Sequence, residues 1–109
     1  MSWDVSLMID TGDKELVEVV DLGNYTYNVS PMYYKAFERK GGFRSLDGMR
    51  VKKAIPILER AIQRMKDDPK QYKKMNPENG WGDYEGALEY LMDILDGCKK
   101  HPKTIIKIY

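Results

Sequence analysis

Two segments of this sequence concentrate amide, hydroxyl and aromatic side chains, which are the groups that recognise polar ligands. In residues 24–30, polar and apolar residues alternate, so an extended chain would place the polar ones on one face. The polar residues of this segment are Asn24, Thr26, Asn28 and Ser30. Because Ser30 precedes Pro31, the sequence predicts a helix that begins here with Ser30 as its N-cap. A helix N-terminus favours an anion, so this one could hold a phosphate.

The second segment, residues 76–84, places two amides and two aromatic rings just before another predicted helix. Its candidate ligand-binding residues are Asn76, Asn79, Trp81 and Tyr84. We expect the two segments to line one site for a polar or anionic small molecule, with an aromatic ring stacked on it. Two structural alternatives remain open. The first segment could be a sheet edge whose amides bond neighbouring loops, and Trp81 could be a lid over the core.

The sequence contains no recognisable set of catalytic or metal-binding residues. His101 is the only histidine, and a serine hydrolase needs a histidine base that an acid orients. Cys98 and His101 stand three residues apart, but Cys98 belongs to an apolar helical stripe and His101 to the end of that helix. The metal- and phosphate-binding motifs HExxH, CxxC and GxGxxG are missing. We therefore predict no catalytic residue, no metal ligand and no cofactor.

Basic residues surround a glycine pair at residues 41–42, and aromatic residues are interleaved with them. The basic residues are Lys35, Arg39, Lys40, Arg44, Arg50, Lys52 and Lys53; the aromatic ones are Tyr33, Tyr34, Phe37 and Phe43. Such a surface can bind nucleic acid through phosphate contacts and base stacking. However, Tyr33 and Phe37 fall on a helix face that must be buried. A solvated basic surface is therefore preferred, and nucleic acid is not the expected partner.

Composition limits the class of protein. The 109 residues suit one domain, residues 1–109, and the net charge of +1 argues against a general nucleic-acid or membrane-surface binder. The charge is uneven, since residues 25–74 carry thirteen bases and five acids, whereas residues 75–98 carry six acids and no base. A single cysteine fits a reducing compartment, and no apolar run is long enough to span a membrane. We expect a cytoplasmic protein without a membrane partner.

The hydrophobic pattern predicts the elements that must position the candidate site. Alternation predicts strands at residues 3–10 and 15–22, joined by a turn at residues 11–14. Gly23 should end the second strand, so residues 24–30 form a third short strand or an edge loop. Helical spacing then predicts helices at residues 31–40, 50–66 and 84–101, with a short helical turn from Pro69. The glycine pair should end the first helix, and Pro56 interrupts the second.

Residues 103–109 form the last predicted strand. It must return to the sheet, because an isolated strand of this apolarity would promote aggregation. The predicted fold is therefore α+β: a small, mostly antiparallel sheet, made of an N-terminal hairpin and a C-terminal strand, packed by two or three helices.

Several motifs are similar to those of a family of small phage- and prophage-encoded proteins. They are SWDV at residues 2–5, NYTYNVSPM at residues 24–32, LDG at residues 46–48, AIPILE at residues 54–59 and NPENGWGDYEGAL at residues 76–88. The resemblance spans nearly the whole chain, and the last motif is long enough to be specific. It implies a phage origin and expression in the host bacterial cytoplasm, but it implies no particular activity.

We therefore expect a phage-encoded, non-enzymatic binding protein that inhibits or sequesters a host defence or regulatory component. In one version the target is a small anionic, nucleotide-like ligand; in the other it is a host bacterial protein bound through the same exposed aromatics. The alternative from another class is a small nucleotide phosphodiesterase or hydrolase, which lacks an obvious base. The sequence is also compatible with a homo-oligomer.

Overall fold

A three-stranded antiparallel sheet forms the base of the molecule in the computed structural model, which describes residues 2–13 and 15–109. The central strand is β1 (Ser2–Asp10); it pairs along its length with β2 (Leu16–Thr26) and through residues 5–8 with β3 (Ile105–Ile108). The predicted hairpin, the return of the last strand and the α+β fold are confirmed. Lys14, which was predicted to lie in the turn, falls outside the described residues.

Strand β2 runs past the glycine that was predicted to end it. Gly23 has a φ of +85° and lies where the register shifts between the pairs Asp4–Asn24 and Ser6–Asp21. This irregularity admits extra chain without ending the pairing, so Asn24 and Thr26 belong to β2 rather than to a separate third strand. The extended face ends at Thr26, because a 3₁₀ turn, η1 (Tyr27–Val29), follows at once.

The helices differ from the prediction mainly at their ends. Helix α1 (Ser30–Phe37) stops earlier than predicted, because Glu38 adopts a left-handed φ of 50° and its N–H bonds to the Tyr34 carbonyl. The glycine pair therefore does not end α1; Gly42 begins a second 3₁₀ turn, η2 (Gly42–Leu46). The remaining helices in the described part of the chain are α2 (Val51–Asp67, with Pro56 inside it), α3 (Pro69–Lys73) and α4 (Tyr84–Lys100).

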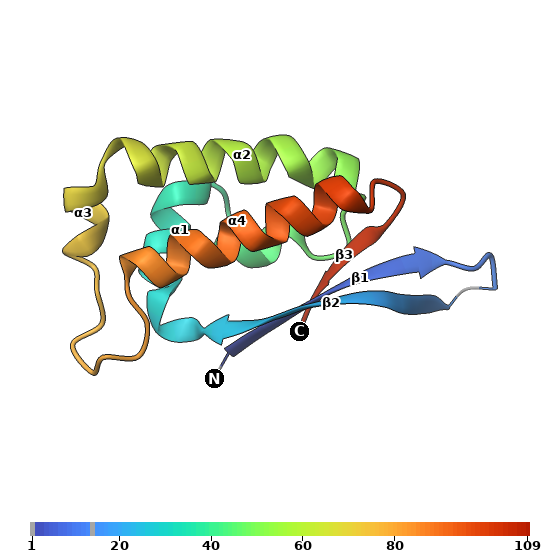
Figure 1. Cartoon of the computed structure of the whole chain (residues 1–109), viewed down its shortest axis with the longest axis horizontal. Helices are drawn as coiled ribbons and strands as arrows, with labels where there is room; N and C mark the ends of the chain where they lie inside the picture. The colour runs from blue at the N-terminus through green and yellow to red at the C-terminus, as the bar shows by residue number, and fades with distance from the viewer. Residues whose placement is uncertain (1, 14) are drawn as a thin grey trace.

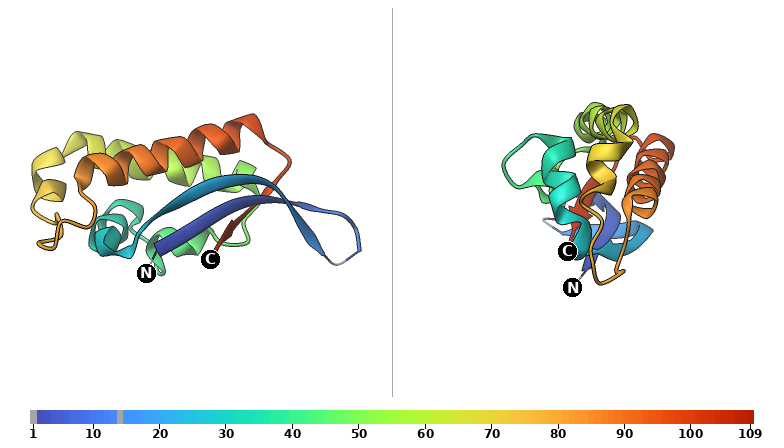
Figure 2. Two further views of the ribbon diagram at one scale, coloured as in Figure 1. Left: turned by 60° about the horizontal axis from the view of Figure 1, so that its bottom comes forward. Right: turned by 90° about the vertical axis from the view of Figure 1, so that its left-hand side faces the viewer.

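Helices α1, α2 and α4 cover one face of the sheet (Figures 1 and 2). In the end-on view at the right of Figure 2, α1 and α4 lie on either side above the sheet, and α2 lies at the top. The core lies between these layers, where Trp3, Val5 and Leu7 of β1 meet apolar residues of the helices. None of the helices in the described ranges combines the length and apolarity that a membrane span requires.

The tip of the β1–β2 hairpin extends beyond the helices, at the right of Figure 1. Its apolar side chains are consequently exposed, with Ile9, Leu16, Val17 and Val19 between 38% and 47% accessible. At the opposite end of the hairpin, β2 passes into η1 and α1, beside the loop that leads into α4. Both predicted ligand-binding segments are found at this end.

Candidate ligand-binding site

The two predicted segments meet at a cavity of about 510 Å³. We call this cavity the amide pocket; its lining residues are Ser2, Asn24, Thr26, Asn28, Asn79 and Trp81. Five of the eight predicted site residues therefore lie together. Ser2 was not predicted, although it pairs with Thr26 in the hairpin and so follows from the register of the two strands.

The end of β2 and the turn after it position the first wall of the amide pocket. Asn24 and Thr26 lie two residues apart on one face of β2, opposite Asp4 and Ser2 of β1. The Thr26 hydroxyl caps η1 by accepting from the backbone N–H of Asn28 at 3.2 Å. It also accepts from the Asn28 side-chain amide at 2.8 Å, which fixes that amide although it lies beyond the strand.

The loop before α4 supplies the second wall. Asn76 Oδ1 accepts from the N–H of Tyr84 at 2.8 Å, and Asp83 caps α4 by accepting from the N–H of Gly86 at 2.7 Å. Asn79 Oδ1 accepts from the backbone N–H of Trp81 at 2.9 Å, and this bond holds the backbone of residues 79–81 in a turn. These local bonds hold the loop in shape without using the Trp81 side chain.

Gly82 allows this loop to lie against β2 and η1. Its φ is +90°, and a Cβ atom there would lie 2.7 Å from Thr26 Cγ2 and 2.9 Å from Val29 Cγ1. The Tyr25 hydroxyl adds a bond at the same junction by accepting from the N–H of Asp83 at 3.2 Å. Neither residue was predicted to position the site, although a glycine between Trp81 and the Asp83 cap is a signal for a close backbone approach.

The amide pocket retains hydrogen-bonding capacity after its internal bonds are counted. Asn79 Nδ2 donates to Asn28 Oδ1 at 3.4 Å, a long and therefore weak contact between the two walls. Each of these amides still has one N–H and one carbonyl lone pair to offer. The Asn24 side chain makes no hydrogen bond within the described residues. Donors and acceptors are thus both available to a ligand.

The charge around the amide pocket does not favour an anion. None of the residues that line the pocket is basic, and the strand neighbour of Asn24 is the carboxylate of Asp4. Side chains already bond the start of α4, through Asn76, Tyr25 and Asp83, and Ser30, whose N–H donates to the Tyr27 carbonyl, does not line the pocket. The pocket therefore suits a neutral polar group better than a phosphate.

Three predicted residues do not line this pocket. Ser30 is the first residue of α1 rather than its N-cap, and its hydroxyl donates to the Tyr27 carbonyl at 2.5 Å. The Asn76 side chain is bonded to the N–H of Tyr84, the first residue of α4. Tyr84 is buried, its hydroxyl donates to the Met65 carbonyl at 2.6 Å, and burial raises its pKa. Trp81, by contrast, is 67% exposed, so it is not a lid over the core.

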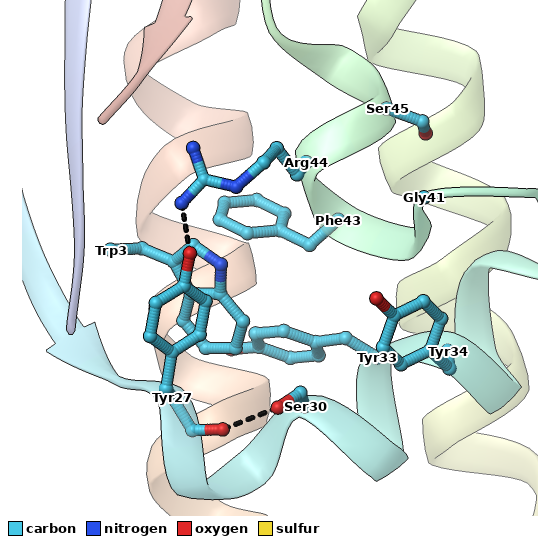
Figure 3. Close-up of a pocket in the computed structure, with 9 residues that line it drawn as sticks. All are labelled: Trp3, Tyr27, Ser30, Tyr33, Tyr34, Gly41, Phe43, Arg44 and Ser45. Carbon is cyan, nitrogen blue, oxygen red and sulfur yellow. Dashed lines mark hydrogen bonds between the residues drawn. The ribbon is translucent and has the colours of Figure 1, made fainter. Parts of the chain in front are cut away.

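A second cavity, of about 260 Å³, lies on the other side of the Thr26–Ser30 turn. We call it the aromatic pocket (Figure 3); its lining residues are Trp3, Tyr27, Ser30, Tyr33, Tyr34, Gly41, Phe43, Arg44 and Ser45. Neighbouring residues thus face different cavities: Ser2 and Thr26 line the amide pocket, whereas Trp3 and Tyr27 line the aromatic one. Part of the basic and aromatic cluster noted in the sequence is located here.

Cys98 lies apart from both pockets. It is fully buried in α4, and burial raises the pKa of its thiol to about 11, so the neutral thiol predominates at pH 7. The described residues include no group of three or more side chains arranged to hold a metal ion.

No family model, curated protein or solved structure matches this chain.

Proposed function

We propose that this chain is a non-enzymatic binding protein whose amide pocket captures a small, nucleotide-like molecule. The observation that supports this most is the shared cavity: Asn28 and Asn79 are 51 residues apart in sequence, yet they line one pocket beside an exposed indole. The exposed Trp81 ring adds little to the core, and it lies beside amide groups that form few bonds within the fold. A ligand that uses both groups would account for them.

The chemistry of the pocket selects a planar, polar partner. Trp81 offers a face on which a base can stack, and stacking of this kind contributes roughly 1–3 kcal/mol. The free amide groups of Asn24, Asn28 and Asn79 pair with the donors and acceptors at the edge of a base or on a sugar. Because no basic residue lines the pocket, we expect it to recognise the nucleoside part and to leave a phosphate in solvent.

Binding without reaction fits the residue types in the pocket. Amide, aliphatic hydroxyl and indole groups do not ionise near neutral pH, so none of them is suited to act as a general base. Retention of the intact ligand is therefore the expected outcome. Several motifs are similar to those of phage-encoded proteins. We therefore expect the captured molecule to belong to a bacterial defence or regulatory system.

Calorimetry with a panel of nucleosides and nucleotides tests this proposal. We expect a nucleoside and its phosphorylated forms to bind with similar affinity, and Trp81→Ala and Asn28→Ala each to weaken binding about tenfold while the fold is kept. Tyr109→Ala and Gln71→Ala are matched controls, because they remove an exposed ring and an exposed amide outside the amide pocket.

No heat from any compound would reject the proposal. If an isolated host protein instead bound the chain, and Trp81→Ala abolished that complex, the protein-binding version would replace it. Conversion of a nucleotide during the titration would favour an enzyme.

A further inference from the structure

The aromatic pocket has a rigid floor that core packing explains. Trp3, Tyr33 and Phe43 are each at most 3% exposed, and their ring centroids lie 5.1–5.4 Å apart. The Tyr33 hydroxyl donates to the Ala87 carbonyl at 2.8 Å, which anchors the floor to α4. These rings would be buried whether or not the cavity above them had a function.

Two features of the aromatic pocket are not explained by packing. The first is Tyr34, which is 58% exposed and yet packed closely against Gly42, where a Cβ atom would lie 3.0 Å from Tyr34 Cδ1. The second is the Trp3 indole N–H. It forms no hydrogen bond within the described residues, and in those same residues no fully enclosed polar side-chain atom is unpaired. The N–H of this almost buried residue therefore retains access to solvent, and Trp3 lines the aromatic pocket.

The rim of the aromatic pocket carries a fixed positive charge. The Arg44 guanidinium donates to the Ile108 carbonyl at 3.2 Å, to the Tyr109 carbonyl at 3.1 Å and to the Tyr27 hydroxyl. The Ile108 carbonyl and the Tyr27 hydroxyl are neutral, and none of the side-chain ion pairs within residues 2–13 and 15–109 includes Arg44. Two of its five N–H groups remain available. No acidic residue lines the pocket, which distinguishes it from the amide pocket near Asp4.

We propose that the aromatic pocket is a second binding site, which takes a small planar aromatic anion. Arg44 and Trp3 lie on one side of the pocket and Tyr34 on the other, with Phe43 and Tyr33 between them (Figure 3). A flat ring lies over these aromatic side chains, and its carboxylate accepts from the free N–H groups of Arg44 and Trp3. The volume is somewhat below the range of about 300–1,000 Å³ typical of drug-sized ligands, so one or two fused rings fit.

The two tryptophans of the chain report on the two pockets separately, because Trp3 lines one and Trp81 the other. Each gives an indole N–H signal in a ¹⁵N–¹H correlation spectrum, and Trp3→Phe and Trp81→Phe assign the signals. Benzoate and 2-naphthoate are titrated into the full chain, with benzamide and 2-naphthamide as neutral counterparts of the same shape.

We expect the acids to shift the Trp3 signal saturably, to bind about tenfold more tightly than the amides, and to leave Trp81 in place. Tyr34→Ala should weaken both kinds of probe by about tenfold, since it removes one ring surface. Arg44→Gln should remove the preference for acids, whereas Arg60→Gln, which replaces an exposed arginine elsewhere, should keep it. A melting curve checks that each variant folds.

A Trp3 signal that none of the four probes moves at millimolar concentration would overturn the proposal. Equal affinity for acid and amide in the unmodified chain would overturn its anionic part, and this comparison needs no variant. A shift of Trp81 alone would assign the probes to the amide pocket and overturn the second site. Nucleoside binding is tested by calorimetry and by variants of the amide pocket, whereas the acids are read at the Trp3 signal, so the present proposal and the proposed function can fail independently.

Discussion

Gly82 shows how a single residue can bring two distant segments together. Its backbone has a φ of +90°, and the space that a side chain would need is filled by Thr26 and Val29. Two requirements thus coincide: a left-handed conformation, which favours glycine, and a close contact, which any larger residue would disrupt. The walls of the amide pocket depend on this contact, because Thr26 belongs to one wall and Trp81 precedes Gly82 in the other.

Gly82→Ala should therefore reduce both stability and ligand binding. Gly80→Ala is the matched control, because Gly80 also has a positive φ, of +76°, but a Cβ atom there would meet nothing within 4 Å. We expect Gly80→Ala to lower the free energy of unfolding by about 1 kcal/mol and Gly82→Ala by roughly 2–3 kcal/mol. Urea unfolding measures both. Equal losses for the two variants would show that the contact with Thr26 and Val29 is unimportant.

The side chains of the candidate site were only partly predictable from residue type. Asn24, Thr26 and Asn28 were identified because they share one face of an extended segment and asparagine is uncommon in strands. Asn76 and Ser30 carry the same kinds of polar atom, but local backbone groups use them, and sequence does not distinguish such use from ligand binding. Ser30 was predicted to be the N-cap of a helix. It is instead the first residue of α1, because η1 directly precedes it and its N–H donates to the Tyr27 carbonyl.

The contact between α4 and β2 positions the candidate site at the level of whole elements. Two glycines on one face of α4 make it close: a Cβ at Gly86 would lie 2.2 Å from the Tyr25 hydroxyl, and one at Gly97 would lie 2.6 Å from Leu22 Cδ2. Their separation is about three helical turns, which puts them in line. The Tyr90 hydroxyl adds a bond to the Gly23 carbonyl at 3.2 Å. This contact orients the start of α4 toward the end of β2.

Gly86→Ala tests this contact because two effects oppose each other. Alanine favours a helix over glycine by about 1 kcal/mol, but here its methyl group collides with the Tyr25 hydroxyl. We expect a net loss of about 1–2 kcal/mol in the free energy of unfolding. In a Tyr25→Phe background the nearest atom becomes Cζ at 3.0 Å, so the same substitution should cost at least about 1 kcal/mol less. Identical effects in both backgrounds would rule out the predicted coupling.

The elements themselves followed from the sequence better than their ends did. Periodicity placed the hairpin, the long helices and the last strand, since each buries one regular face. The end of β2 was missed because a glycine with a positive φ can sit in a strand irregularity as well as in a turn. The end of α1 was missed because Glu38, not a glycine, adopts the left-handed conformation.

At the scale of the whole molecule, the charge blocks seen in the sequence pair in part. Lys73–Glu85 joins the basic middle of the chain to the acidic segment that follows, and Lys99–Glu59 and Lys107–Asp47 join the last lysines to the middle. The side chains in these pairs are between 32% and 64% exposed, so each pair contributes little in water. Stability depends instead on the buried core, which includes several groups that must stay uncharged.

These groups make stability decrease at alkaline pH. Burial raises the pKa of Cys98 to about 11 from an ordinary 9.0, and raises the pKa values of Tyr33 and Tyr90 above the ordinary 10.0. Above their ordinary pKa values, these groups lose protons in the unfolded chain but keep them in the folded one. The unfolded state then binds fewer protons, so the free energy of unfolding falls as pH rises.

We therefore expect the stability of the folded chain to be steady up to about pH 8.5, to begin falling near pH 9 as unfolded Cys98 ionises, and to fall more steeply above pH 10. Each group contributes a slope of up to about 1.4 kcal/mol per pH unit while it is ionised only in the unfolded state. Urea unfolding at half-unit steps from pH 8 to 11 measures the profile. Cys98→Ala isolates the first stage: it lowers stability at every pH by leaving a small cavity, but it should flatten the slope between pH 9 and 10. Parallel profiles for the two proteins would mean that the thiol ionises equally in both states, and burial of Cys98 would then have no influence on folding at alkaline pH.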